Sequence, residues 1–333
     1  MKVALLDDYQ HVAMKMADWG RLGSRAEVVP FHEHIADQDE LARRLQLFDA
    51  VMLVRERTKF PRTLFEKLPN LKLIITAAHW NAAIDLDAAT AHNVQVCGTK
   101  DWGFATAELA LGLMIALARN ITIEDRAMRA GHWQTTLGSG LHGKTLGIVG
   151  LGLLGTQMAR FGQVLGMDVL AWSQNLTDET ATKAGAKLVS KRELLAQSDV
   201  VTIHLKLSDR TRGLIGRDDL AVMKPTATII NTSRGPIIEE AALLDTLQEK
   251  RIAGAGLDVY GHEPLPVDHP FRKLDNVIVL PHLGYVVEQN YRLVYSHVLE
   301  DIEAFMDGRV LRPLNELPGD SKAQMNRKSH AID

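Results

Sequence analysis

The chain has 333 residues, of which 46% are hydrophobic and 24% are charged, the balance of an ordinary folded protein. This length exceeds the usual size of one hydrophobic core, so we expect two domains. The formal net charge of -3, with a pI near 6.5, leaves no overall basic field and disfavours nucleic acids and anionic membranes as partners.

Three local features bear on the cellular compartment. The segment Met1–Asp8 has too short an apolar run, and acidic residues too early, for a secretory signal, so we expect no export. The longest apolar stretch, Leu109–Ala118, is far shorter than the ~20 residues that cross a bilayer, and we interpret it as a buried helix. Cys97 is the only cysteine, which excludes an intramolecular disulfide and favours the reducing cytoplasm. Its place at the end of an apolar run indicates inert packing.

Short aliphatic runs typical of strands alternate with longer helical patterns, first in residues 3–97 and again in residues 145–280. The runs of the second series are apolar almost throughout, as in parallel strands that are covered on both faces. We therefore predict an α/β protein with two doubly wound, Rossmann-like domains. The predicted strands are Val3–Leu6, Ala50–Val54, Leu73–Thr76, Val94–Cys97, Thr145–Val149, Val169–Trp172, Val200–His204, Thr228–Asn231, Ala255–Val259 and Val277–Leu280.

Helical patterns connect and follow the two series. Residues 102–133 contain a very apolar helix and then a charged one at Thr122–Ala130, which we interpret as a hinge and an oligomer contact. Apolar residues recur at helical spacing from Val294 to Phe305, before Gly308, and predict a helix that crosses back to pack on the first domain. Residues 319–333 lack any apolar period, so we expect a flexible tail there.

A glycine-rich loop at residues 150–155, Gly-Leu-Gly-Leu-Leu-Gly, directly follows the strand predicted at Thr145–Val149 and opens a helical pattern that runs to Leu165. In such loops the first glycine permits the tight turn, the second lets the backbone approach a pyrophosphate, and the third lets the helix pack on the strand. The helix N-terminus then faces the phosphates with free N–H groups. We predict a dinucleotide site formed by Gly150, Gly152, Leu153, Leu154 and Gly155.

The end of the next strand bears on the choice of cofactor. An acidic residue about 20 positions after the glycine loop normally holds the adenosine ribose. Here the strand ends in Ser173, Gln174 and Asn175, which carry no negative charge to repel a ribose 2′-phosphate and no arginine to bind one. The expected cofactor is therefore NADP(H) or NAD(H), with NADP(H) mildly favoured.

Three loops in the last third of the chain each place a polar residue after a predicted strand, namely Arg234, Glu263 and His282. The carboxyl ends of parallel strands meet at one edge of a sheet, so we expect these side chains to converge. A guanidinium binds a carboxylate or polarised carbonyl through two hydrogen bonds, and an imidazole exchanges a proton near neutral pH while a carboxylate holds it. Alternatively, each residue has a purely local structural role: Arg234 caps a turn, Glu263 starts a loop and His282 bonds to a backbone carbonyl.

Taken in chain order, the motifs resemble the D-isomer-specific 2-hydroxyacid dehydrogenase family over nearly the whole chain. They are the glycine loop, Asn-Thr-Ser-Arg-Gly at 231–235, Gly-Leu-Asp-Val at 256–259, Glu-Pro at 263–264 and Pro-His-Leu-Gly at 281–284. The resemblance implies a discontinuous, flavodoxin-like substrate domain of residues 1–100 and 286–333. It implies an inserted NAD(P)-binding Rossmann domain of residues 101–285, a crevice between the two, and a homodimer with a dimerisation segment at about 102–135.

The same resemblance implies a 2-keto acid reductase of the glyoxylate or hydroxypyruvate type. The nicotinamide would deliver hydride to C2 of the keto acid, while His282 donates a proton to the carbonyl oxygen and Glu263 stabilises the imidazolium. Arg234 would bind the carboxylate and the carbonyl oxygen together. Asp258 resembles the residue that contacts the nicotinamide amide. Further cofactor contacts are implied at His204, Thr232, Ser233 and Gly284.

The substrate loop departs from the family pattern. Where the family has a glycine-rich turn that presents N–H groups to the substrate carboxylate, this chain has Ala-Ala-His-Trp-Asn at 77–81. We expect carboxylate binding to survive with an altered wall of Ala78, His79 and Trp80; alternatively, Trp80 packs between domains and His79 is solvated. Arg55, at the end of another strand, either recognises a second anionic group or is a solvated surface arginine.

Histidines occur at two other places in the sequence, and we interpret neither place as a metal site. His32 and His34 flank Glu33 as a possible metal pair, but no third ligand stands at a compatible spacing, so we expect a solvated strand end. His262 adjoins Glu263 and is expected to point away from it. We therefore expect no metal site.

Other functions stay open. A 3-phosphoglycerate dehydrogenase usually needs extra anion-binding residues and often a regulatory domain, for which we expect no room here. A formate dehydrogenase lacks the acid found at Glu263. A nucleotide-sensing protein of the C-terminal-binding-protein corepressor type shares the fold, and intact Arg234, Glu263 and His282 do not exclude it. Turnover of NADPH or NADH with a panel of keto acids discriminates between these functions.

Overall fold

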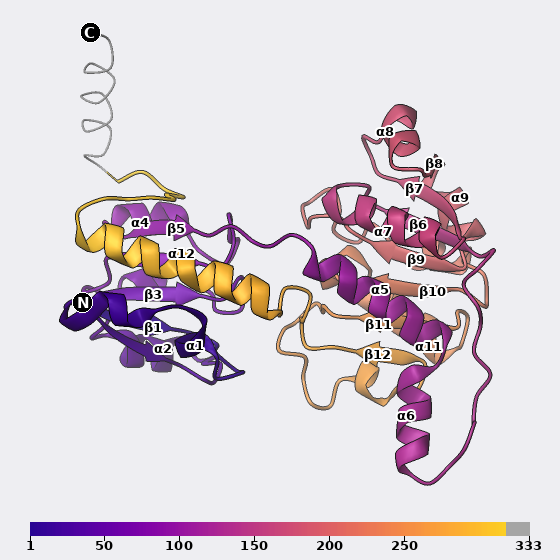
Figure 1. The fold of residues 1–333 in the computed structure, drawn as a ribbon, viewed down its shortest axis with the longest axis horizontal. Helices are drawn as coiled ribbons and strands as arrows, with labels where there is room; N and C mark the ends of the chain where they lie inside the picture. Colours follow the sequence, from indigo (N-terminus) through magenta and orange to yellow (C-terminus); the bar gives the residue numbers. More distant parts are fainter. Residues whose placement is uncertain (318–333) are drawn as a thin grey trace. The chain divides into compact units, whose positions relative to one another are not determined.

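The computed structural model describes residues 1–317, which divide into two compact units (Figure 1). Unit 1 comprises Met1–Trp102 and the segment that begins at Val287, whereas unit 2 comprises Gly103–Val286. Each unit is a parallel α/β structure, as predicted. The tail expected at 319–333 lies outside the described residues.

Unit 1 is built on a five-stranded parallel sheet with the order β2-β1-β3-β4-β5 in the described residues. This is the flavodoxin-like order predicted for the first domain. Its strands are β1 (Lys2–Leu5), β2 (Glu27–Pro30), β3 (Ala50–Leu53), β4 (Leu73–Thr76) and β5 (Gln95–Gly98). Its helices are α1 (Ala13–Met16), the 3₁₀ helix η1 (Trp19–Arg25), α2 (Gln38–Leu45), α3 (Arg62–Phe65), α4 (Leu86–Ala91) and α12 (Glu288–Met306).

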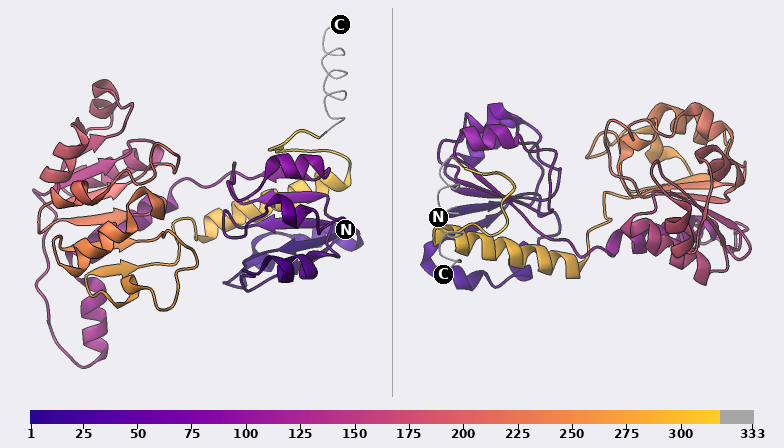
Figure 2. Two further views of the ribbon diagram at one scale, coloured as in Figure 1. Left: turned by 180° about the vertical axis from the view of Figure 1, so that it is seen from behind. Right: turned by 90° about the horizontal axis from the view of Figure 1, so that it is seen from above.

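The long helix of unit 1 is α12, which the apolar spacing from Val294 to Phe305 predicted. Strands β3 and β4 are buried at every residue because helices cover both faces of the sheet (Figure 2, right). Helix α12 packs on α1 and β4, so the last described helix lies beside the first (Figure 1). It ends before Gly308, whose φ of 71° suits the turn that follows. The predicted return to the first domain is confirmed.

Unit 2 contains a seven-stranded parallel sheet with the order β12-β11-β10-β9-β6-β7-β8. The chain builds outward from β6 to β8 and then crosses to β9 on the other side of β6, so the topological switch point lies between β6 and β9. Its strands are β6 (Thr145–Val149), β7 (Asp168–Trp172), β8 (Lys187–Leu188), β9 (Val200–Ile203), β10 (Thr228–Asn231), β11 (Gly254–Leu257) and β12 (Val277–Val279). Its helices are α5 (Ala105–Ala118), α6 (Ile121–Arg129), α7 (Leu153–Val164), α8 (Asp178–Lys183), α9 (Lys191–Gln197), α10 (Arg217–Ala221), η2 (Gly235–Ile237), α11 (Glu240–Gln248) and η3 (Pro270–Lys273).

Helix α5 packs on β10, β11 and α7 of unit 2. Gly256 lets it come close, since a Cβ there would lie 3.2 Å from Leu117 and 3.3 Å from Leu113. Burial is confined to part of the helix, and Leu111 and Ile115 stay half-buried, so the buried helix predicted at Leu109–Ala118 is only partly correct. Helix α6 has no buried residue, and with the extended segment after it projects from the rest of unit 2 (Figure 1; Figure 2, left).

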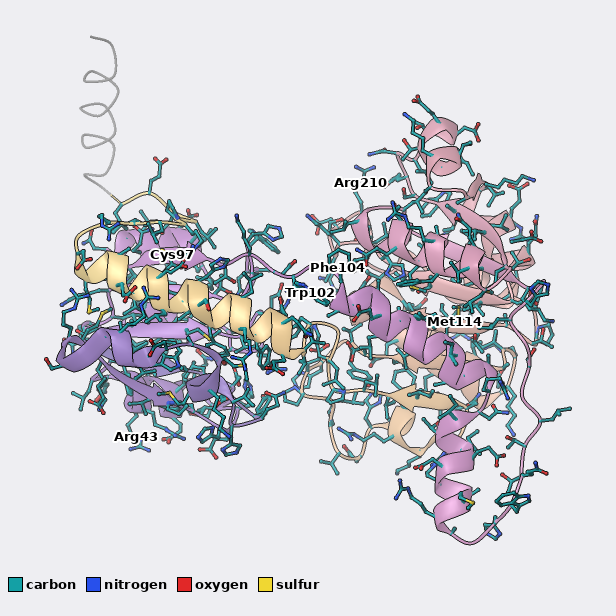
Figure 3. The ribbon with its side chains drawn as sticks, in the orientation of Figure 1. Arg43, Cys97, Trp102, Phe104, Met114 and Arg210 are labelled. Carbon is teal, nitrogen blue, oxygen red and sulfur yellow. The ribbon has the colours of Figure 1, made fainter. Side chains whose placement is uncertain are left out.

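Across residues 1–317, no single helix has the length and apolar character needed to cross a membrane. Only α5 and α6 together, bent by 63°, meet that test by length and composition. Cys97 is buried in β5 within unit 1, as predicted (Figure 3). Burial, with the charge of Asp301, raises the pKa of its thiol to about 12, so Cys97 is an unreactive packing residue.

Two strands escaped prediction, and both lie at sheet edges. Strand β2 ends in Pro30 and is only partly buried, and β8 has two residues. An edge strand pairs on one side only, so it forms without a continuous apolar run and tolerates a proline. Most other strands begin or end within one or two residues of the predicted limits.

Candidate active site

The glycine-rich loop lies between β6 and α7, at the switch point of unit 2. Gly150 has a φ of 102°, and a Cβ there would lie 2.7 Å from the carbonyl oxygen of His204. A Cβ at Gly155 would lie 2.0 Å from the carbonyl oxygen of Gly150, so α7 reaches the loop only because residue 155 has no side chain. At Gly152 a Cβ would meet no described atom within 4 Å. This glycine faces open space, where a ligand can approach the backbone.

A dinucleotide fits this loop on two further grounds. Helix α7 has Gly152 as its N-cap, so no side chain of the described residues caps the N–H groups of its first turn. On the neighbouring strand ends, the Nδ1 atom of His204 and the Oγ1 atom of Thr232 are buried without a hydrogen-bond partner in the described structure. Buried polar atoms left unsatisfied cost stability, and a ligand that hydrogen-bonds to them would remove that cost.

His204 follows β9 and is held as a neutral imidazole. Burial lowers its pKa to about 4. The residue as a whole is half-buried, but Nδ1 is hidden from solvent and Nε2 lies 2.8 Å from the Oγ1 atom of Thr202. The burial of the ring decides the pKa, because the charge of an imidazolium resides on the ring.

Ser173, Gln174 and Asn175 directly follow β7, the strand beside β6. Ser173 is half-buried, whereas Gln174 and Asn175 are exposed. The end of β7 therefore offers neutral hydrogen-bonding groups at the position where a carboxylate holds the ribose in many dinucleotide sites.

Arg234, Glu263 and His282 lie in loops that follow β10, β11 and β12, three neighbouring strands. Gly235 brings the first two loops into contact, since a Cβ there would lie 2.0 Å from the carbonyl carbon of Tyr260. The amide of the buried Asn231 donates to the carbonyl oxygen of Arg234 at 3.0 Å and fixes the backbone there. The convergence of these loops is found as predicted, and their catalytic roles remain predictions.

Glu263 and His282 form a hydrogen-bonded pair, with 2.6 Å between Oε2 of the carboxylate and Nδ1 of the imidazole. The other carboxylate oxygen accepts the N–H of Tyr260 at 3.0 Å. Burial alone would raise the pKa of Glu263, but the hydrogen bond and charge of His282, the Tyr260 N–H and the charge of Arg234 hold that pKa below its ordinary value. Glu263 is thus an anion that orients the ring of His282.

Asp258 supports the loop that carries His282. It is fully buried, and its two carboxylate oxygens accept the N–H groups of Leu283 at 2.7 Å and Gly284 at 2.8 Å. These bonds hold the residues that follow His282, whose φ of 56° is uncommon for a residue with a side chain. Burial raises the pKa of Asp258 to about 6, although the two N–H groups oppose that rise. This structural task escaped prediction because its partners belong to the next strand's loop.

The residues predicted to bind substrate in unit 1 follow β3 and β4, which are neighbours. Arg55 is half-buried, Ala78 is buried, His79 is exposed and Trp80 is 56% exposed. The N–H of Ala78 donates to the carbonyl oxygen of Thr76 at 2.8 Å. In the described chain, the N–H groups of His79 and Trp80 make no such backbone bond.

The histidines near β2 are not a solvated pair. The Nδ1 atom of His34 lies 3.0 Å from Oδ1 of Asp7, and the His34 side chain is 17% exposed, so the expected solvated strand end is wrong there. His32 is more exposed and lies 3.1 Å from the carbonyl oxygen of Asp8. His262 is exposed, while Glu263 faces His282. No group of three His, Cys, Asp or Glu side chains in residues 1–317 is arranged to hold a metal ion.

The sequence of the chain matches a known protein family. A family model described as "D-isomer specific 2-hydroxyacid dehydrogenase, NAD binding domain" matches residues 111–284. The chain is 36% identical over 285 residues to D-3-phosphoglycerate dehydrogenase of Methanocaldococcus jannaschii, covering 84% of this chain and 54% of that protein. It is 37% identical over 262 residues to glyoxylate reductase of Thermococcus litoralis, covering 76% of this chain and 79% of that protein.

The fold has a close counterpart among solved structures. A phosphoglycerate oxidoreductase of Vibrio cholerae superposes with a TM-score of 0.89 at 37% identity, covering 92% of this chain and 99% of that chain. The chain spans about half the length of the curated 3-phosphoglycerate dehydrogenases that it matches, 54% in two of them and 55% in a third. By its family model, its relatives and its fold, the chain belongs to the D-isomer specific 2-hydroxyacid dehydrogenase family.

Proposed function

We propose that the protein is an NAD(P)-dependent D-2-hydroxyacid dehydrogenase that acts as a 2-keto acid reductase. The observation that carries this proposal is the 2.6 Å pair of Glu263 and His282, in a loop cluster that also holds Arg234, beside a glycine loop that fits a dinucleotide. These parts supply proton transfer, carbonyl binding and a hydride donor in one unit of the chain. A reaction of this kind does not require a metal ion.

The residues of the cluster divide the chemistry between them. A bound nicotinamide supplies the hydride. His282 donates a proton to the carbonyl oxygen as negative charge develops on it, and Glu263 balances the charge of the protonated ring. Arg234 binds the carboxylate and the carbonyl oxygen together, which orients C2 and stabilises the developing alkoxide. Asp258 keeps the His282 loop in place through the two N–H groups that it accepts.

The substrate is proposed to be a small 2-keto acid of the glyoxylate or hydroxypyruvate type. The names of the relatives support two classes, glyoxylate reductase and D-3-phosphoglycerate dehydrogenase, so oxidation of 3-phosphoglycerate is the second candidate. In unit 1, the N–H groups of His79 and Trp80 are proposed to meet the substrate carboxylate. Arg55 is proposed to recognise the far end of the substrate, where it would favour a second anionic group.

Three finer features complete the proposal. NADP(H) is mildly favoured over NAD(H), because Ser173, Gln174 and Asn175 place no carboxylate at the end of β7. The protein is proposed to be a homodimer, joined through a segment at about 102–135. A cytoplasmic location is proposed from the single, buried cysteine.

The test is a panel of glyoxylate, hydroxypyruvate, larger 2-keto acids and 3-phosphoglycerate, each assayed with both nicotinamide cofactors. We expect steady turnover of at least one keto acid by the wild-type protein. The His282→Ala variant should lose turnover by a factor on the order of 10² to 10⁴, the usual worth of a general acid, and still bind cofactor. Unchanged turnover in that variant would remove His282 from the mechanism.

A non-catalytic outcome is also defined. A nucleotide-sensing protein of the corepressor type would bind NADH or NADPH tightly and turn over no acid in the panel. Cofactor fluorescence titration measures this binding. A change in assembly or partner binding when cofactor alone is added then distinguishes a sensor from an enzyme that lacks its correct substrate.

A further inference from the structure

Three loops leave the carboxyl edge of the unit 1 sheet side by side, because β3 lies between β1 and β4. The loop after β3 carries residues 55–58, the loop after β4 carries residues 77–81, and the loop after β1 carries Asp7. Leu53 at the end of β3 pairs with Thr76 at the end of β4, so these two loops begin at the same level.

Asn81 joins two of these loops. Its side chain is buried, and its Nδ2 atom donates to the carbonyl oxygen of Arg55 at 2.6 Å and to the Oγ1 atom of Thr76 at 2.8 Å. Its Oδ1 atom accepts the N–H of Ala83 at 2.8 Å. Both donor positions and the acceptor of the amide are engaged, so the side chain has a single favourable orientation.

The bond to Arg55 falls at a strained point of the backbone. Arg55 has a φ of 54°, in the left-handed region that costs a residue with a side chain about 1 kcal/mol or more. Asn81 holds the carbonyl group of this same residue. The bond therefore offsets the strain and fixes the direction in which the Arg55 side chain leaves the loop. A glycine would adopt this conformation freely, but it would supply no guanidinium.

The far end of the same loop is held from the opposite side. Oδ2 of the buried Asp7 accepts the hydroxyl of Thr58 at 2.7 Å, and its carbonyl oxygen accepts an N–H of the Arg57 guanidinium at 3.3 Å. His34 lies 3.0 Å from the other carboxylate oxygen. Asp7 thus holds the loop at Thr58, and Asn81 holds its backbone at Arg55.

We propose that Asn81 is a positioning residue that directs Arg55 toward the substrate. This rests on the proposed function, in which Arg55 recognises the far end of the keto acid. Loss of the Asn81 amide lets the turn at Arg55 relax, so substrate binding weakens while proton and hydride transfer, which use unit 2, continue. The effect therefore appears in KM for the keto acid, with kcat and the affinity for cofactor little changed.

The test is a double-mutant cycle with Asn81→Ala, Arg55→Ala and the double variant. We expect Asn81→Ala and Arg55→Ala each to raise KM about tenfold, the effect of losing roughly 1.4 kcal/mol. The double variant should resemble Arg55→Ala to within about twofold. Asn70→Ala is the matched control, since that exposed amide also donates to a backbone carbonyl, of Gln46 at 2.8 Å, away from these loops.

Independent effects, in which the two KM changes multiply, would overturn the proposal. Deuterium uptake of the peptide covering residues 54–60 provides a readout besides activity and should rise in Asn81→Ala but not in Asn70→Ala. If the wild-type protein turns over no acid, the proposed function fails. In that case, unchanged deuterium uptake in Asn81→Ala would separately overturn the positioning role of Asn81. If Asn81→Ala does not fold, Asn81→Asp takes its place, because it keeps the shape and the acceptor but loses both donors.

Discussion

Two imidazoles at the carboxyl edge of the unit 2 sheet have opposite surroundings. His282 faces the carboxylate of Glu263. His204 instead faces the hydroxyl of Thr202 with one ring nitrogen, and its other ring nitrogen is buried. Burial holds the ring of His204 neutral, whereas the ring of His282 is oriented by an anion. The two histidines follow β9 and β12, which β10 and β11 separate in the sheet, so one residue type stands in two different environments.

The buried His204 should make the protein sensitive to acid. Its folded pKa of about 4 lies below the ordinary value of 6.5, so its contribution to stability is complete above pH 6.5 and is lost as the pH falls toward 4. The difference of about 2.5 units at 1.36 kcal/mol each corresponds to about 3 kcal/mol. As the pH falls from 6.5 to 4, the free energy of unfolding of the wild-type protein should therefore decrease by about 3 kcal/mol more than that of the His204→Gln variant.

Urea unfolding at a series of pH values measures this difference. His262→Gln is the matched control, since that ring is exposed. Parallel pH dependence of wild type and His204→Gln would show that the imidazole charges freely in the folded protein.

Individual site residues were predictable to different degrees. Arg234, Glu263 and His282 were accessible from sequence because each directly follows a strand, and parallel strands end at one edge. The supporting tasks of Asp258 and Asn81 were not, because each acts through a bond to a loop from another strand. Such a partner is set by the order of strands in the sheet, which local patterns leave open.

At the scale of elements, the junction of β6 and α7 assigns separate tasks to glycines that look alike in sequence. Gly155 is required by packing inside the protein, while Gly152 has no described neighbour within 4 Å of its Cβ position. The fold therefore requires a glycine at residue 155, whereas at residue 152 it leaves open space beside the backbone.

This difference predicts opposite results for two substitutions. Gly155→Ala should destabilise the protein by about 1–3 kcal/mol, because its Cβ would lie 2.0 Å from the carbonyl oxygen of Gly150. Gly152→Ala should leave the free energy of unfolding within about 0.5 kcal/mol of wild type and weaken cofactor binding about tenfold or more. Chemical unfolding and fluorescence titration with NADH and NADPH measure the two quantities. Normal cofactor affinity in Gly152→Ala would mean that the pyrophosphate does not approach this glycine.

Sequence patterns predicted most strands and the long helices, because central strands and core helices need continuous or periodic apolar residues. The edge strands β2 and β8 lacked that signal, since each pairs on one side only. Helix α5 was interpreted as buried because its apolar residues surround it, yet part of its surface is left half-buried. Composition gives the apolar character of a helix but not the number of neighbours that cover it.

At the scale of the whole molecule, α6 and the segment after it carry apolar side chains without a place in the core. Trp133 is 74% exposed, Leu137 is 96% exposed and Met128 is 57% exposed. Exposed apolar groups gathered in one projecting segment mark a surface that another chain covers. This supports the proposed homodimer through a segment at about 102–135.

The double variant Trp133→Ser with Leu137→Ser should shift the protein from dimer toward monomer, because it removes the two most exposed apolar side chains of the segment. Size-exclusion chromatography with light scattering gives the mass. Val267→Ser is the control, since Val267 is 91% exposed elsewhere on unit 2. A monomeric wild-type protein, or a double variant with the wild-type mass, would contradict the proposed dimer.

The return of α12 to unit 1 has a consequence for synthesis on the ribosome. The whole sheet of unit 1 is encoded in the first 98 residues, but the helix that packs on α1 and β4 emerges only after all of unit 2. Unit 2 is continuous and can close its core as soon as it has emerged. Unit 1 is therefore begun before unit 2 and completed after it, and until α12 emerges the surfaces of α1 and β4 that it covers are open to chaperones.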